Sequence, residues 1–176
     1  MREFIAIDIP EEIKKKIVEV QQALLKQGLF EGKLTERENL HLTLKFLGEI
    51  DERTEKEERG RLGKVKMGEF KAKLGKVGVF SESFIRIIWI ELDNCGEIQN
   101  EVDEKLSGIF ARENRFMSHL TLARVKSVKD KRRLIDELGK IKISGEFPVS
   151  EFSLKKSDLT GKKPVYREIE KYSLER

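Results

Sequence analysis

The chain contains only two histidines, His41 and His119, and each one begins the tetrapeptide His-Leu-Thr-Leu. With 19 leucines and 5 threonines among 176 residues, an accidental Leu-Thr-Leu after the second histidine has a probability of roughly three in ten thousand. Free imidazole titrates near neutral pH, so one histidine can accept a proton while another donates one. The duplicated motif therefore predicts a pair of histidines that do acid–base chemistry.

The residues around each motif alternate between apolar and polar, which is the pattern of a strand with one dry face. In residues 40–46 the leucines lie on one face, and His41, Thr43 and Lys45 lie on the other. Each motif thus sets an imidazole beside a hydroxyl, and threonine hydroxyls and backbone N–H groups can donate hydrogen bonds to phosphate oxygens. This reasoning predicts the pair but leaves open which histidine is the acid and which the base.

Other chemistries fit the sequence less well. Two histidines without a matching acidic or thiol cluster fall short of the three or four ligands that zinc takes, so we expect no metal and no cofactor. Neither a serine elbow nor a Gly-rich nucleotide-binding loop is present. Cys95 is the single cysteine, and we expect it to be a small buried apolar residue.

Periodicity and turn residues predict the elements that position the motifs. Asp8 and Pro10 are expected to start the first helix, and Gly28 to end it. Strand, helix, strand with His-Leu-Thr-Leu, and helix follow one another twice, which predicts an α+β fold of two similar antiparallel lobes with a cleft between them. We expect residues 1–176 to form one domain, with the motifs near 41–44 and 119–122. The predicted strands cover 4–8, 40–46, 73–79, 84–92, 116–123, 141–154 and 165–174, and the predicted helices cover 11–28, 51–66, 97–111 and 129–138.

Composition limits the class of protein. Charged residues make up 39% of the chain and hydrophobic residues 38%, and the net charge is +4. These values are typical of a folded globular protein, and no apolar run reaches the roughly 20 residues of a membrane helix. The first residues contain acidic side chains and Pro10 where a signal peptide would have its apolar segment. We therefore expect a cytoplasmic protein without membrane contact, acting as a monomer.

The paired motifs resemble those of a known family. The opening residues 2–10, the stretch 38–48 and the stretch 119–125 are similar to the 2H phosphoesterases, in particular to the RNA 2′,3′-cyclic phosphodiesterases, also called 2′-5′ RNA ligases. The resemblance covers nearly the whole chain. It implies a bilobal, pseudo-two-fold α+β fold in which the two His-x-Thr motifs face each other across a cleft, and a substrate that is RNA with a 2′,3′-cyclic phosphate end, transfer-RNA fragments being one source.

Roles for the motif residues come from this resemblance. It implies that His41 donates a proton to the leaving 3′ oxygen, that His119 activates water, and that Thr43 and Thr121 hold the phosphate. The product would be a 2′-phosphomonoester. Ligation would be the same chemistry with a 5′-hydroxyl in place of water.

Basic and aromatic residues near the motifs are candidates for contacts with the substrate. We expect Lys45 to share the face of His41. Arg124 has the opposite parity to His119, so it reaches the cleft only if the strand ends or bulges there. Tyr166 is a candidate for stacking on a base, whereas Phe46, Phe116 and Trp89 are expected to lie in the core. The basic residues that could form a rim for the RNA backbone are Arg86, Arg115, Lys126, Lys162 and Lys163.

Two other functions remain open from the sequence. One is ATP-independent 2′-5′ joining as the main reaction, since Lys156-Ser157-Asp158-Leu159 lacks the glycine of the lysine motif found in nucleotide-activated ligases. The other is a noncatalytic RNA-binding module, which would bind RNA in a salt-dependent way without forming product.

Overall fold

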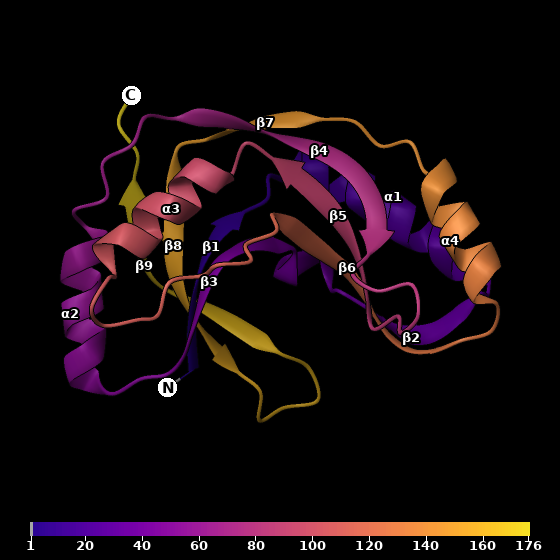
Figure 1. The fold of residues 1–176 in the computed structure, drawn as a ribbon, viewed down its shortest axis with the longest axis horizontal. Coiled ribbons are helices and arrows are strands. Elements are labelled where there is room, and N and C mark those ends of the chain that lie inside the picture. Colours follow the sequence, from indigo (N-terminus) through magenta and orange to yellow (C-terminus); the bar gives the residue numbers. More distant parts are fainter. Residues whose placement is uncertain (1) are drawn as a thin grey trace.

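A computed structural model describes residues 2–176 (Figure 1). The four helices of this part of the chain are α1 (Glu11–Lys26), α2 (Glu52–Leu62), α3 (Gly96–Lys105) and α4 (Lys131–Lys140). Its strands are β1 (Arg2–Asp8), β2 (Phe30–Leu34), β3 (His41–Glu49), β4 (Phe70–Val79), β5 (Ile87–Asp93), β6 (His119–Val128), β7 (Glu146–Val149), β8 (Glu151–Asp158) and β9 (Val165–Ser173). A short 3-10 helix, Arg37–Asn39, precedes β3.

The strands form two antiparallel sheets, and each sheet contains one His-Leu-Thr-Leu motif. The first sheet has the order β3-β1-β8-β9, and the second has the order β2-β6-β5-β4-β7. In Figure 1, α2 and α3 lie toward one end of the molecule and α1 and α4 toward the other. The predicted α+β fold with two antiparallel lobes is confirmed.

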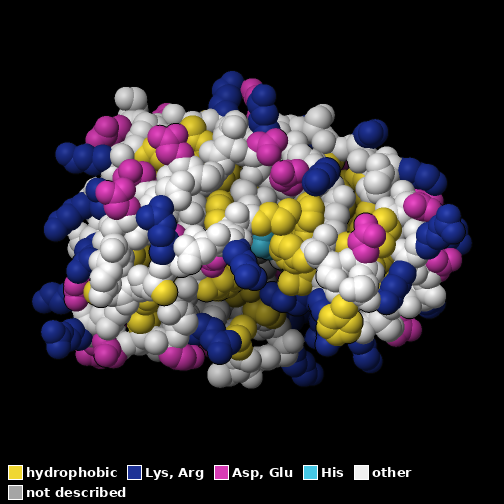
Figure 2. All heavy atoms as spheres, viewed as in Figure 1, with side chains coloured by type: hydrophobic (Ala, Val, Ile, Leu, Met, Phe, Trp, Pro, Cys, Tyr) yellow, Lys and Arg dark blue, Asp and Glu magenta, His cyan; other side chains and the backbone are white. Residues whose placement is uncertain are grey.

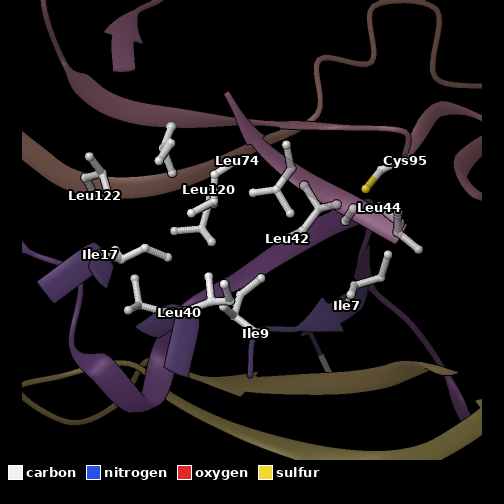
Figure 3. Packing of buried hydrophobic residues seen from close by; sticks show 14 of the residues in the cluster. Ile7, Ile9, Ile17, Leu40, Leu42, Leu44, Leu74, Cys95, Leu120 and Leu122 are labelled. Carbon is white, nitrogen blue, oxygen red and sulfur yellow. The ribbon is translucent and has the colours of Figure 1, made fainter. Parts of the chain in front are cut away.

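The leucines of the two motifs anchor both motif strands in one core. Leu42, Leu44, Leu120 and Leu122 are all buried, and β3 and β6 contact each other although they belong to different sheets. Figure 3 shows these side chains pointing into the same packed cluster. Burying a leucine side chain stabilises the fold by about 2 kcal/mol, so the same residues that hold the sheets together also fix the strands that bear the histidines.

Helix α1 follows the predicted pattern, because its residues at three- and four-residue spacing, including Ile13, Ile17 and Leu24, are buried. Gly28 has a φ of 64°, the left-handed conformation that favours glycine after a helix. The expectation for Asp8 is wrong. The N-cap position is occupied by Pro10, and the Asp8 carboxylate forms an ion pair with Lys155 of β8 instead.

Three elements differ from the sequence prediction. The single strand predicted over 141–154 is two strands, β7 and β8, which belong to different sheets. Strand β2 was not expected, because residues 30–34 contain Glu, Gly and Lys and show no alternation; pairing with β6 makes it a strand. The helix predicted over 97–111 ends at Lys105. Gly108 then takes a φ of 88°, a conformation that helices exclude, so Ile109 and Phe110 pack against the core from a turn.

A pair of carboxyl groups is buried between the first sheet and α2. Glu3 of β1 and Glu58 of α2 are both 0% exposed, and none of their oxygens has a hydrogen-bond partner among residues 2–176. Burial, together with the neighbouring Glu3 carboxyl, raises the pKa of Glu58 to about 9. Burial also raises the pKa of Glu3. The pair therefore retains a proton at neutral pH.

Among residues 2–176, no helix is long and apolar enough to cross a membrane.

Candidate active site

His41 is held in place by its own backbone neighbourhood. Its Nδ1 lies 2.7 Å from the Asn39 carbonyl oxygen, and its Nε2 lies 3.0 Å from the Thr43 hydroxyl. A carbonyl can only accept, so in the neutral ring Nδ1 bears the proton and Nε2 accepts from Thr43. The predicted pairing of imidazole and hydroxyl on one strand face is present at this motif.

His119 repeats the same arrangement in the second sheet. Its Nδ1 lies 2.8 Å from the carbonyl oxygen of Met117, two residues earlier in the chain, as Asn39 is to His41. The two rings therefore both use Nδ1 as a backbone donor and leave Nε2 for chemistry. Figure 2 shows an imidazole (cyan) in a depression near the middle of one face of the molecule, between apolar and basic side chains.

Each motif strand contains an extra residue directly after the threonine. In β3 the register moves from Ala6 opposite Thr43 to Ile5 opposite Lys45, so Leu44 is unpaired with β1. In β6 it moves from Trp89 opposite Thr121 to Ile88 opposite Ala123, so Leu122 is the extra residue. Such bulges reverse the parity of the residues that follow them. Two consecutive residues are accordingly buried at each bulge, and the next residue is exposed.

The bulge in β3 overturns two expectations. Lys45 is buried on the side away from His41, where it forms an ion pair with Asp103 of α3 and donates a hydrogen bond of 2.7 Å to the Ala111 carbonyl. Lys45 is thus buried in an ion pair and does not share the face of His41. Phe46 is not in the core but 77% exposed, and it takes the place on the histidine side that Lys45 was expected to have.

The Asp103 carboxylate is satisfied by several donors. Burial alone would raise its pKa, but hydrogen bonds from Lys45, the Glu113 N–H and Gln99 lower it, so Asp103 is charged. This cluster fastens the chain around residues 111–113 to β3 and α3.

The bulge in β6 brings Arg124 to the same side of the strand as His119. From the sequence, this placement was predicted only if the strand ended or bulged before Arg124. Arg124 is exposed, and its charge opposes the rise in the pKa of Tyr166 that burial causes. The Tyr166 ring in turn meets the edge of His41 at a centroid distance of 5.2 Å. Tyr166 therefore contacts His41 of the first sheet and lies within range of the charge of Arg124 in the second sheet.

A buried glutamine supports the β6 bulge from α1. Gln21 Nε2 donates 2.9 Å hydrogen bonds to the carbonyl oxygens of Leu122 and Thr35. The Thr35 N–H also donates to the Leu122 oxygen, at 2.9 Å. The extra residue of the bulge is thus held by Gln21 of α1 as well as by Thr35, which directly follows the neighbouring strand β2.

Aromatic rings flank both histidines. Two of these rings, Phe80 and Phe4, were not predicted from the sequence to lie there. Phe80, 53% exposed, meets His119 edge-on at 4.9 Å. On the other side Phe4 lies 5.0 Å from His41 and 6.3 Å from Phe46. The alternation in residues 40–46 gave a misleading signal for Phe46, because the bulge at Leu44 cannot be read from the pattern. Trp89 is buried as expected.

Two of the basic residues predicted to form a rim, Arg86 and Lys163, have different partners. The guanidinium of Arg86 lies 4.6 Å above the centre of the Phe84 ring. Lys163 forms an ion pair of 3.6 Å with Glu36, and the neighbouring Pro164 carbonyl accepts a hydrogen bond of 3.1 Å from Asn39. The loop between β8 and β9 is therefore attached beside the residue that orients His41.

Burial sets the charge of His41 in the free protein. Burial and, to a lesser extent, the positive charge of Lys155 outweigh the hydrogen bond to Asn39 and lower the pKa of His41 to about 4. At neutral pH the free protein holds this imidazole neutral. A phosphate monoanion 4 Å away would favour the imidazolium by about 4 kcal/mol at an effective dielectric constant of 20, which corresponds to about 3 pKa units.

The remaining candidate groups are accounted for. Cys95 is buried as expected, and burial raises the pKa of its thiol to about 11. Residues 2–176 contain no group of three or more His, Cys, Asp or Glu side chains that could hold a metal ion.

Two contacting strands from separate sheets, each bearing a His-x-Thr motif, are typical of the 2H phosphoesterases. The chain belongs to the LigT-like phosphoesterase family, whose model matches residues 7–89 and 91–166. It is 42% identical to the RNA 2′,3′-cyclic phosphodiesterase of Methanocaldococcus jannaschii over 98% of this chain and 100% of the relative.

Solved structures agree with this assignment. The crystal structure of TT0787 of Thermus thermophilus is similar with a TM-score of 0.80 and 29% identity, covering 98% of this chain and 97% of that chain. The fold is also that of Escherichia coli LigT complexed with 3′-AMP, at a TM-score of 0.78 and 24% identity over 99% and 98% of the two chains.

Proposed function

We propose that this protein hydrolyses RNA 2′,3′-cyclic phosphodiester ends to 2′-phosphomonoesters without a metal or cofactor. The observation that supports this most directly is the repeated geometry of His41 and His119, each with Nδ1 on a backbone carbonyl and each on a separate sheet. Relatives that match nearly the full chain are named RNA 2′,3′-cyclic phosphodiesterases.

In the proposed mechanism His119 is the base. Its Nε2 takes a proton from water as the water oxygen attacks phosphorus. The bond from phosphorus to the 3′ oxygen breaks on the opposite side, and His41 Nε2 gives its proton to that oxygen. Thr43, Thr121 and the guanidinium of Arg124 stabilise the negative charge on the phosphoryl oxygens.

The low pKa of His41 fits a donor that becomes charged only when substrate is bound. The cyclic phosphate supplies the negative charge that raises the pKa of His41 toward neutrality, so the acid is generated in the complex and not in the free protein. Phe46 and Tyr166 flank this side of the site, and we propose that they stack on the base of the terminal nucleotide.

We further propose that the protein acts as a monomer in the cytoplasm and that transfer-RNA fragments are among its substrates. Its basic residues would neutralise backbone phosphates, so binding of RNA should weaken as salt increases.

The test is incubation of purified protein with an RNA ending in a 2′,3′-cyclic phosphate, in the presence of a chelator, followed by identification of the monoester. The proposal predicts a 2′-phosphate, and predicts that His41→Ala and His119→Ala each abolish its formation. Lys140→Ala, at an exposed lysine, is the matched control and should be as active as the wild type. Binding of RNA without turnover would instead indicate a noncatalytic module.

A further inference from the structure

The loop between β4 and β5, residues 80–86, presents two exposed aromatic rings, and one of them, Phe80, lies against His119. Phe80 is 53% exposed and Phe84 is 64% exposed, although large aromatic side chains are usually buried in a monomer. Figure 2 shows apolar side chains gathered directly beside the imidazole on this face. Exposed apolar surface next to reactive groups indicates a binding site.

The local structure explains why Phe80 stands there. Gly78 of β4 lies opposite Trp89 of β5, and a Cβ at this glycine would be 2.8 Å from the indole ring. The missing side chain lets the indole lie flat against β4. Phe80, two residues after Gly78, then packs on the indole at 5.7 Å and against His119 at 4.9 Å. The ring is thereby fixed in position while half of it remains exposed.

Phe84 is the second exposed ring of this loop, and it is associated with a positive charge. The guanidinium of Arg86 lies 4.6 Å above its ring centre, and Arg86 has no ion-pair partner within residues 2–176. An aromatic ring together with an unpaired arginine is suited to a nucleobase and its neighbouring phosphate.

We propose that Phe80 and Phe84 form a subsite for a second nucleic-acid strand, the one whose 5′-hydroxyl takes the place of water. This inference rests on the proposed function. In an in-line displacement, the attacking oxygen and the leaving oxygen lie on opposite sides of phosphorus. The oxygen that His119 activates therefore enters from the side of Phe80, and any nucleoside attached to that oxygen must lie against this loop.

The reaction at this subsite balances without ATP. The 5′-hydroxyl loses its proton to His119, and its oxygen bonds to phosphorus. The bond from phosphorus to the 3′ oxygen breaks, and that oxygen takes a proton from His41. One 2′-5′ phosphodiester and one free 3′-hydroxyl result. The donor nucleotide is held by Phe46 and Tyr166, so the two strands have separate aromatic platforms.

The experiment measures how the protein partitions one cyclic-phosphate RNA between water and a 5′-hydroxyl oligonucleotide. Stacking on an aromatic ring is lost in Phe84→Ala, so we expect the ratio of joined to hydrolysed product to fall about tenfold, and to recover in Phe84→Trp. Phe80→Ala should lower the ratio likewise. Phe46→Ala, which affects the shared donor, should reduce both products and keep their ratio, and Leu25→Ala, at an exposed leucine of α1, should leave the ratio unchanged.

The ratio is insensitive to loss of folded protein, because misfolding lowers both products equally. An unchanged ratio in Phe80→Ala and Phe84→Ala would overturn the subsite. A second readout does not need turnover: a 5′-hydroxyl oligonucleotide with 2-aminopurine as its first base should be quenched by the wild type and not by Phe84→Ala. If neither product forms, the proposed function fails while this fluorescence still decides the subsite, and equal quenching by both proteins would refute it.

Discussion

Replacing Glu58 by glutamine should remove a pH dependence of stability that originates in the buried carboxyl pair. The pKa of Glu58 is about 9 in the folded protein, against 4.5 as its ordinary value. A carboxyl whose pKa is raised by folding contributes its full stability below pH 4.5 and loses it as the pH rises toward 9. Glutamine is neutral throughout and can donate a hydrogen bond to Glu3, so Glu58→Gln has no such loss.

The magnitude follows from the interval of pH. Each pH unit between the two pKa values costs about 1.4 kcal/mol, so going from pH 5 to pH 8 should lower the free energy of unfolding of the wild type by up to about 4 kcal/mol relative to Glu58→Gln. The variant should therefore resemble the wild type near pH 5 and be the more stable protein at pH 8. In Glu58→Gln, helix α2 should pack against the first sheet equally well at pH 5 and at pH 8.

Urea denaturation followed by far-ultraviolet circular dichroism at pH 5 and pH 8 gives the four free energies required. Glu57→Gln is the matched control, since Glu57 is the adjacent residue but is exposed and pairs only with Arg61. It should change stability by a few tenths of a kcal/mol at either pH. If the difference between Glu58→Gln and the wild type were the same at both values of pH, the reasoning about the buried pair would be refuted.

Three further results are expected. In an NMR titration, His41 of the free protein should remain neutral until the pH approaches about 4, and inorganic phosphate should raise its midpoint because the anion favours the imidazolium; an unshifted midpoint would contradict the proposed donor. Gln21→Leu should lower the free energy of unfolding by about 1–3 kcal/mol and also lower kcat, whereas Gln22→Leu on the exposed side of α1 should do neither. Burial and a thiol pKa of about 11 should make Cys95 react with a disulfide reagent at least about a hundredfold more slowly in the native protein than in urea; equal rates would show that the thiol is accessible.

The histidine pair and the α+β fold could be predicted because repetition and alternation are local properties of the sequence. The face on which Lys45 and Phe46 lie could not, since one extra residue at Leu44 exchanges them without changing the pattern of residue types. The side on which Arg124 lies could be predicted only conditionally, because it depends on the extra residue Leu122. Leu122 is held by a hydrogen bond from Gln21, which is 101 residues away in the chain. Strand β2 was missed for a similar reason, because its partner β6 and not its own composition makes it a strand.

The order of strands in the first sheet has a consequence for how the protein is made. Strand β1 is in the middle of that sheet, between β3 and β8, and the ion pair between Asp8 and Lys155 spans 147 residues. During synthesis the strand that bears His41 can pair with β1 early, but the other edge of β1 has no partner until residues 151–158 leave the ribosome. Such distant pairing slows folding and leaves an unpaired strand edge exposed meanwhile. The growing chain therefore holds His41, half of the proposed catalytic pair, on an incomplete sheet for most of its synthesis.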